Sequence, residues 1–173
     1  MGTATAPSHF EKLTRCCMAC RISRFLDKTI TIEKAGVARV AIPFPADLTQ
    51  NSNFLHAAVL FEVGDTAGFM AANSMEETYS VLTVDYYINL MRPVQQEGIS
   101  ATATVVNAGK TLYVARSDIY SDSGKLVAAG QGTYMVSKIP LAELEGYEDD
   151  AGTQRADEGA ADGADRDRAG ADA

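Results

Sequence analysis

Residues 50–73 have the sequence QNSNFLHAAVLFEVGDTAGFMAAN, and this stretch decides the fold. The part from Phe54 to Ala72 contains no proline and is long enough for a helix. Its apolar residues lie on every side, which is typical of a helix that is buried all round. Gly64 and Gly68 each cost a helix roughly 1 kcal/mol relative to alanine, so packing against other elements must supply the compensation. The small residues along this helix would let those elements approach closely.

Three polar side chains interrupt this apolar surface, namely His56, Glu62 and Asp65. Carboxylates are rarely buried without a partner, so Asp65 needs an explanation. His56 and Asp65 are nine residues apart. At about 100° per residue they project from opposite sides of one helix, with a rise of roughly 13 Å between them. They cannot meet within one helix, but two antiparallel copies across a two-fold axis would bring them together in two equivalent sites.

Six runs of alternating or β-branched residues predict strands. Short turns between successive runs indicate antiparallel pairing. In the longest run, alternation places the even-numbered residues Leu82–Leu90 on one face and the odd-numbered residues Val81–Asn89 on the other. The predicted strands are Thr29–Glu33, Val37–Phe44, Thr78–Met91, Ile99–Val106, Thr111–Tyr120 and Leu126–Val136.

Two further segments complete the predicted fold. His9–Leu26 has apolar residues close to helical period, which predicts one amphipathic helix. The polar loop Ala46–Asn53 leads into the central helix, with Ser52 or Asn53 as the candidate N-cap. The sequence therefore predicts an α+β fold, in which one long helix packs against an antiparallel sheet of five or six strands.

The charge of the chain is unevenly distributed. The formal net charge is −8, and residues 148–173 contain nine acids and three arginines, a net of −6. That segment lacks large apolar groups, so we expect a disordered acidic tail over residues 148–173, a flexible N-terminus over residues 1–8 and one folded domain over residues 9–147. We expect no nucleic-acid partner and no membrane span, because there is no basic patch with interleaved aromatic residues and no sufficiently long apolar run. Without a signal-peptide pattern, the expected location is cytoplasmic.

The three cysteines lie together in the run RCCMAC, as Cys16, Cys17 and Cys20. A zinc site would need further ligands, and the chain has only His9 and His56. A redox motif would belong to a parallel βαβ unit, which the pattern does not contain. We therefore interpret the cysteines as small apolar residues of a helix.

The order of a hairpin, a long buried helix and four antiparallel strands resembles the hotdog fold. Over about residues 29–137, the chain resembles the PaaI-like acyl-CoA thioesterases of that fold, the phenylacetate-degradation type. That family has an asparagine, then His-Gly-Gly, then an acid nine residues after the histidine. Here His56-Ala57-Ala58 stands at the first motif, and Asp65 of Val63-Gly64-Asp65 has the matching spacing. Further similarities are Thr83-Val84-Asp85, Met91-Arg92-Pro93, Gly109-Lys110-Thr111 and Gly130-Gln131-Gly132-Thr133.

The resemblance implies an acyl-CoA thioesterase that works as a homodimer or homotetramer. Coenzyme A would enter only as part of the substrate, and no metal or other cofactor is implied. Asp65 of one subunit would be the general base or nucleophile, while His56 and the Ala57 N–H of the other subunit would orient and polarise the thioester. Alanine keeps the backbone N–H where the family has glycine. The implied substrate-binding residues are Gln50 and Asn53 near the position of the family asparagine, Thr83 beside the acid, and Arg92 and Lys110 for the coenzyme A phosphates.

Each of these residues also has a structural interpretation. His56 at a helix start could be a cap or a satisfied buried group, and Thr83 could be an ordinary strand residue. Arg92 and Lys110 could be solvated charges. Glu62, one turn before Asp65, is the rival acid.

Two other functions stay open at this point. A non-catalytic hotdog protein that binds acyl-CoA or another acyl ligand is favoured by Ala57 and Ala58, whereas the retention of Asp65 favours the enzyme. A hotdog dehydratase would use a catalytic histidine with an acid, and the position of Asp65 in the middle of the helix disfavours it.

Overall fold

The computed structural model describes residues 7–148, which form one sheet and three helices. The six strands are all antiparallel, in the order β1-β2-β4-β5-β6-β3. The α+β arrangement predicted from the sequence is therefore confirmed, with six strands. The elements are α1 (His9–Ala19), α2 (Arg21–Phe25), β1 (Thr29–Lys34), β2 (Val37–Ile42), a 3₁₀ turn (Ala46–Leu48), α3 (Ala57–Asn73), β3 (Tyr79–Leu90), β4 (Ile99–Ala108), β5 (Leu112–Ser121), β6 (Leu126–Pro140) and a second 3₁₀ turn (Leu141–Glu143).

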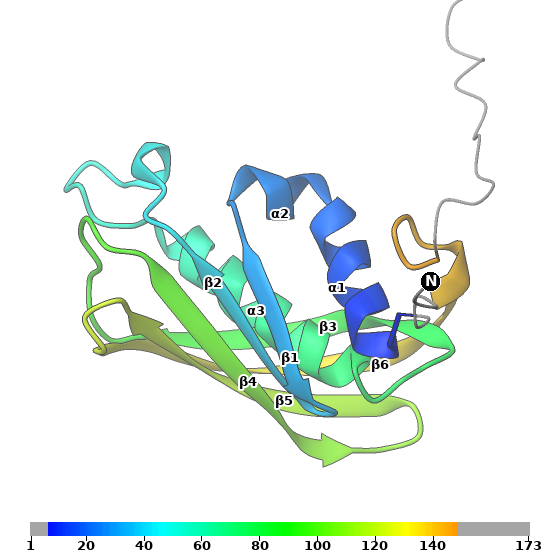
Figure 1. Ribbon diagram of the computed structural model, residues 1–173. Coiled ribbons are helices and arrows are strands. Elements are labelled where there is room, and N and C mark those ends of the chain that lie inside the picture. The colour runs from blue at the N-terminus through cyan, green and yellow to red at the C-terminus, as the bar shows by residue number, and fades with distance from the viewer. Residues whose placement is uncertain (1–6, 149–173) are drawn as a thin grey trace, which may run out of the picture.

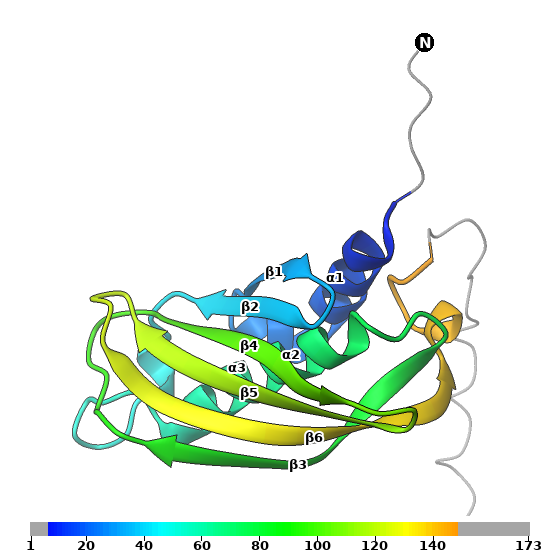
Figure 2. The same ribbon diagram turned by 90° about the horizontal axis from the view of Figure 1, so that it is seen from below.

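The sheet curves around α3, and α1 and α2 lie on the opposite side of α3 from β4 and β5 (Figure 1). The core lies between α3 and the concave face of the sheet, and Val63, Ala67 and Met70 of the helix have no exposed surface there. Within residues 7–148, no helix covers the outer face of the sheet (Figure 2). The fold therefore consists of one sheet that curves around the central helix α3.

The central helix begins later than the sequence predicts. It starts at Ala57 rather than Phe54, and its N-cap is His56 rather than Ser52 or Asn53. The reason is a long-range contact, because the buried Leu55 donates its N–H to the carbonyl of Val94 at 2.8 Å and so stays extended. The helix then begins at the next residue.

The helix is also not buried all round. Ten of its 17 residues are buried, but Phe61 is 41% exposed, and Ala57 and Ala58 are exposed as well. Phe61 contacts the ring of Tyr86 on β3, with ring centroids 5.0 Å apart, and Ala58 borders a cavity that α2 also lines, but these neighbours leave the stripe exposed. An apolar stripe left open beside a packed core is typical of a surface that meets another molecule.

The predicted helix His9–Leu26 is broken in two at Cys20. This residue is extended (φ −62°, ψ 136°), and it ends α1 and begins α2. The break redirects the chain so that Leu26 and Lys28 are buried, at 4% exposure each. Tertiary packing thus overrides a helical period that continues through Cys20.

The predicted alternation of β3 changes face at a bulge. Thr83 and Asp85 oppose the adjacent residues Tyr134 and Thr133 of β6, so Val84 is the extra residue. Before the bulge the odd-numbered residues face α3, whereas after it Tyr86 faces α3. The prediction of one even-numbered face was therefore wrong.

Two tyrosines explain the glycines of α3. A Cβ on Gly64 would lie 2.1 Å from the hydroxyl oxygen of Tyr86, and one on Gly68 would lie 2.0 Å from that of Tyr134. Gly130 and Gly132 on β6 leave space for the same two hydroxyls, with corresponding distances of 2.4 Å and 2.7 Å. Each phenol thus occupies a slot between a helix glycine and a strand glycine, which supplies the packing compensation that the sequence requires. We call these the Tyr86 slot (Gly64, Gly130) and the Tyr134 slot (Gly68, Gly132).

The two ends of the described chain meet at α1. Ser8, within the segment expected to be flexible, closes a capping box with Glu11, and the side chain of His9 contacts the hydroxyl of Tyr147 at 2.8 Å. Glu148 pairs with Lys12 at 3.0 Å. The remainder of the predicted acidic tail, residues 149–173, and residues 1–6 of the N-terminus lie outside the described residues.

The cysteines of α1 are free thiols. Cys16 and Cys17 pack against the core, while Cys20 is exposed at the helix break. Burial raises the pKa of Cys16 to about 11 and also raises the pKa of Cys17. Both thiols are therefore protonated at neutral pH, which agrees with their interpretation as apolar packing residues.

Candidate active site

Asp65 lies in the middle of α3, where the helix faces β3 and β6. Its carboxylate accepts hydrogen bonds from the Thr83 hydroxyl at 3.1 Å and 3.3 Å, and from the Tyr134 hydroxyl at 3.3 Å. Within residues 7–148, no cation forms an ion pair with it. A half-buried carboxylate that is held only by hydroxyls has no cation to neutralise its charge. Such a carboxylate can act as a base or a nucleophile.

The surroundings of Asp65 oppose its ionisation. Burial raises the pKa of Asp65 above its usual value of 3.8, and the hydrogen bonds from Thr83 and Tyr134 act in the opposite direction. For Tyr134, burial and the charge of Asp65 both raise the pKa, so its hydroxyl stays protonated and can only donate to the carboxylate. A carboxylate destabilised in this way is a better proton acceptor than a solvated one.

Glu62, the rival acid, has a different environment. Its Oε1 pairs with the Lys28 ammonium and accepts a hydrogen bond from Thr66 at 3.0 Å. The Lys28 side chain is only 1% exposed, against 24% for Glu62, so this is a largely buried ion pair. The charge of Glu62 is thus neutralised by a structural partner, whereas that of Asp65 is not.

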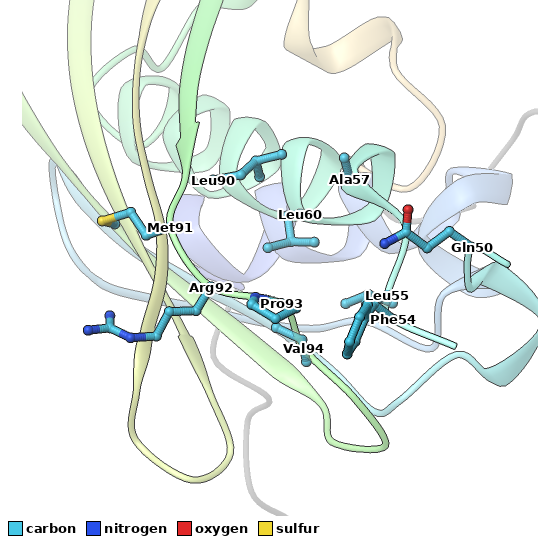
Figure 3. Close-up of a pocket in the computed structure, with 10 residues that line it drawn as sticks. All are labelled: Gln50, Phe54, Leu55, Ala57, Leu60, Leu90, Met91, Arg92, Pro93 and Val94. Carbon is cyan, nitrogen blue, oxygen red and sulfur yellow. The ribbon is translucent and has the colours of Figure 1, made fainter. Parts of the chain in front are cut away.

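A pocket of about 280 Å³ opens at the start of α3 (Figure 3). Three predicted site residues line it: Gln50 from the preceding loop, Ala57 at the first helical position and Arg92 after β3. The Gln50 amide lies beside the helix start, whereas the Arg92 guanidinium points away from the other residues and donates to the Leu126 carbonyl at 2.6 Å. The other residues that line the pocket are Phe54, Leu55, Leu60, Leu90, Met91, Pro93 and Val94.

The helix start gives this pocket an electropositive side. Backbone N–H groups of the first helical turn have no partner within the helix, and the helix dipole places partial positive charge there. The Ala58 N–H is taken by Nδ1 of His56 at 3.1 Å. No hydrogen bond from the Ala57 N–H occurs within the described part of the chain, so this donor is available to an oxygen atom in the pocket.

The structure does not bring all the predicted residues to one place. His56 is the helix cap, and its ring borders a separate cavity of about 450 Å³ that Phe25 and Glu62 also line. Asn53 has positive φ (60°) and donates its N–H to the Gln50 carbonyl at 2.8 Å, so it shapes the loop. Lys110 lies in the β4–β5 turn, at the end of the sheet opposite Leu90.

The site also contains a residue that the sequence reasoning missed. Tyr134 follows the Gly130-Gln131-Gly132-Thr133 run and reaches Asp65 from β6. The signal was available, because alternation along a strand places Gly130, Gly132 and Tyr134 on one face. Two glycines next to a tyrosine on the buried face indicate space reserved for a large side chain.

Asp65 does not line the pocket at the start of its own helix. Ala57 is eight residues earlier, which is roughly 12 Å along the axis. Asp65 instead lies beside β3, the last strand of the sheet, whose outer edge has no partner strand among residues 7–148. Within one chain, Asp65 and the pocket at the helix start are therefore separate.

Comparisons with known proteins show what this chain is similar to. Residues 52–128 match the sequence model of the Thioesterase superfamily. A "Putative esterase" of Saccharolobus solfataricus is 29% identical over 122 residues, which cover 70% of this chain and 86% of that protein. A "Putative esterase" of Haemophilus influenzae is 28% identical over 132 residues, covering 75% and 94%. The solved structure of the E. coli PaaI protein, from the phenylacetic acid degradation operon, has a TM-score of 0.69 at 24% identity and covers 77% of this chain and 97% of its own.

The curved antiparallel sheet around one long helix is thus the hotdog fold, as predicted. The chain is similar in sequence to the Thioesterase superfamily and in fold to the PaaI protein, so the resemblance to PaaI-like hotdog thioesterases is confirmed. The matches support thioester hydrolysis as the general activity. No helix within residues 7–148 has both the length and the apolar character that crossing a membrane requires.

Proposed function

We propose that this protein is an acyl-CoA thioesterase whose active site is shared between two subunits. The observation that carries the proposal is Asp65, a half-buried carboxylate on an apolar helix that only hydroxyl groups hold. Structural carboxylates in such places are normally paired with a cation, as Glu62 is with Lys28. The lack of such a partner in the described chain favours a catalytic role.

In the proposed reaction, the thioester carbonyl lies in the pocket at the start of α3. The Ala57 N–H and the positive end of the helix stabilise the oxyanion that forms when the carbonyl carbon is attacked. Asp65 of the other subunit either takes a proton from the attacking water or attacks the carbon itself, giving an acyl anhydride that water then hydrolyses. In both cases the carbon–sulfur bond breaks, and coenzyme A leaves as the thiol after protonation. The products are a free acid and coenzyme A.

The second subunit is proposed to dock along β3. This strand has a free outer edge, and three of its outward side chains are apolar and exposed: Leu82 (44%), Val84 (57%) and Tyr87 (64%). An edge strand with such a face is prone to pair with another chain. Two β3 strands paired about a two-fold axis would join the sheets and bring the start of one α3 toward the middle of the other.

Two cationic side chains suit the coenzyme A moiety. Arg92 lies at the mouth of the pocket and Lys110 at the far end of the sheet. In a two-fold assembly, the Lys110 of one subunit would lie toward the Leu90 end of the other. We propose that these cations meet the coenzyme A phosphates from two subunits. A cytoplasmic location agrees with this choice of substrate.

The first test is hydrolysis of a panel of acyl-CoAs, followed by detection of the released thiol. Asp65→Asn keeps the shape of the side chain but removes the carboxylate, and the turnover number should fall by about 10²–10⁴-fold. Asp118→Asn is the matched control, because Asp118 pairs with Arg116 at 3.1 Å on β5, away from the pocket and from Asp65. Near-full activity of Asp65→Asn would show that the catalytic acid is wrongly assigned.

The second test asks whether two subunits share the site. Ala57→Pro removes only the backbone N–H, because proline fits the first position of a helix and His56 already has the extended conformation (ψ 140°) that precedes a proline. Ala57→Ser keeps the N–H and is the control. Asp65→Asn and Ala57→Pro should each be inactive alone. Refolded together in equal amounts, they should recover about a quarter of full activity, since half the dimers contain one intact site.

Two results would contradict the shared site: no recovery in the mixture, or a monomeric mass by light scattering at micromolar concentration. Binding of acyl-CoA without thiol release by the unmodified protein would identify a non-catalytic acyl-CoA-binding protein instead. Ala57→Gly with Ala58→Gly would then test whether the two alanines prevent hydrolysis.

A further inference from the structure

We infer that Tyr134 is a positioning residue for Asp65: its hydroxyl fixes the orientation of the carboxylate and stabilises the charged form. This inference rests on the proposed function, since it assigns Tyr134 a part in that same site. Nothing in the family motifs of the sequence points to this residue. The inference comes from the geometry of the Tyr134 slot.

The slot determines where the hydroxyl lies. Tyr134 has no exposed surface, and its oxygen is 3.3 Å from Oδ1 of Asp65 and 3.3 Å from the Asp65 backbone carbonyl. Gly68 on one side and Gly132 on the other leave no space for a Cβ next to that oxygen. The ring therefore enters from β6 and ends at Asp65, where its hydroxyl touches the carboxylate and the backbone of the same residue.

In this contact the Tyr134 hydroxyl is the hydrogen-bond donor and Asp65 is the acceptor. The buried tyrosine stays protonated, so its single hydrogen is shared between two acceptors of Asp65. A hydrogen bond donated to a carboxylate favours the ionised form. Phenylalanine keeps the ring in the slot and leaves only the space of the hydroxyl oxygen, between Gly68 and Gly132, unfilled. The hydroxyl is the part of Tyr134 that acts on Asp65.

Other charged and titratable groups also face Asp65, and they influence its pKa together with Tyr134. Glu62 on α3 raises the pKa of Asp65, and Lys28, the residue before β1, lowers it. Asp85 and Tyr86 on β3 raise the pKa of Tyr134. A change at Tyr134 that leaves these groups in place isolates its hydroxyl.

The chain offers a matched control in the Tyr86 slot. Tyr86 also inserts its ring between a helix glycine and a strand glycine, but its hydroxyl contacts the Ser117 hydroxyl at 2.6 Å instead of a carboxylate. Tyr86→Phe and Tyr134→Phe each remove one partly or fully buried hydroxyl from equivalent packing. Only the second removes a donor from Asp65.

The experiment is the pH profile of kcat/KM for an acyl-CoA that the unmodified protein hydrolyses. In Tyr134→Phe the acid limb should move to higher pH by about half to one unit, because the carboxylate loses a donor and protonates more easily. KM should change by less than about twofold, since Tyr134 does not touch the substrate pocket. In Tyr86→Phe the acid limb should stay where it is in the unmodified protein.

The inference is overturned if folded Tyr134→Phe, checked by circular dichroism, has the acid limb of the unmodified protein. A second readout separates this failure from failure of the proposed function. The Asp65 carboxyl can be titrated by ¹³C NMR, with its resonance assigned by its loss in Asp65→Asn. A protein without thioesterase activity would refute the proposed function, but Tyr134→Phe would still have to raise the Asp65 pKa in that titration.

A second variant covers the case in which Tyr134→Phe does not fold. Replacement of Tyr134 by 3-fluorotyrosine keeps the ring and makes the hydroxyl a stronger donor. The acid limb and the NMR titration of Asp65 should then both move to lower pH, opposite in sign to the phenylalanine variant. An unchanged Asp65 titration in the fluorotyrosine protein would overturn the inference on its own.

Discussion

Glu62→Gln should destabilise the protein by about 3 kcal/mol, although glutamine has the size of glutamate. The structure gives the reason. The Lys28 side chain is 1% exposed and Glu62 is its charge partner; within residues 7–148 its ammonium donates one further hydrogen bond, to the Thr66 hydroxyl at 3.1 Å. Removing one member of a buried ion pair costs about 3–5 kcal/mol because the other charge remains buried. The lower end applies because Glu62 is 24% exposed and a glutamine oxygen can still accept a hydrogen bond from Lys28.

The companion variants make this a double-mutant cycle. Lys28→Met should cost less than Glu62→Gln, since the Glu62 side chain is 24% exposed and its Oε1 keeps the hydrogen bond from Thr66, although its Oε2 is buried without a hydrogen-bond partner. The double variant contains neither charge and should lie within about 1 kcal/mol of the unmodified protein. The coupling energy, which is the sum of the two single costs minus the cost of the double variant, is then at least about 2 kcal/mol. Thioester hydrolysis by the double variant should persist, because Glu62 is not the catalytic acid in our proposal.

The assay is urea unfolding at pH 7, followed by circular dichroism, with all four proteins at the same concentration so that assembly contributes equally. Additive costs in the double variant would refute the reasoning, since they would show that Lys28 and Glu62 do not depend on one another. Loss of hydrolysis in a folded double variant would return Glu62 to the list of catalytic candidates.

Two further predictions follow from the packing and charge of α3. Gly68→Ala should destabilise by about 2 kcal/mol despite its better helix propensity, because the new Cβ would lie 2.0 Å from the Tyr134 hydroxyl; a gain of stability in urea unfolding would contradict the Tyr134 slot. Asp65→Asn should stabilise the fold at neutral pH. The pKa of Asp65 is raised in the folded protein, so its contribution to stability is fully present below the unfolded-state pKa near 3.8 and is lost as the pH rises through the folded-state pKa. The melting temperature of Asp65→Asn minus that of the unmodified protein should therefore grow from pH 4 to pH 7. A melting-temperature difference that does not change with pH would count against a raised pKa of Asp65.

The main elements could be predicted because their signals are local and repeated. Six alternating runs separated by turns define the strands, and the apolar stretch around Val63 defines a helix that other elements surround. The errors have long-range causes. Leu55 is kept out of the helix by the Val94 carbonyl, and the helix break at Cys20 serves the burial of Lys28 against Glu62. No local pattern contains these partners.

The candidate site shows the same division. The spacing of His56 and Asp65 correctly excludes their meeting on one helix, and the family motifs place Thr83 beside Asp65, where the structure gives 3.1 Å. Tyr134 lies 69 residues from Asp65 in sequence, and their contact depends on the register of β6 against β3 and on the bulge at Val84. Such a register results from the whole sheet, so the sequence indicates space for a large side chain at Tyr134 but not that its hydroxyl meets Asp65.

The two tyrosine slots also determine how α3 can move. Gly64 and Gly68 are one helical turn apart, and each faces a ring that is anchored on a different strand. Sliding the helix along its axis, or rotating it, would drive a residue larger than glycine into one of those rings. The contact between helix and sheet therefore leaves α3 almost no freedom to translate or rotate. Asp65 and Thr83 keep their relative position when the surrounding structure fluctuates. In the proposed function, a displacement that admits an acyl group would have to come from segments outside this contact, such as the loop around Asn53, whose backbone has a positive φ (60°).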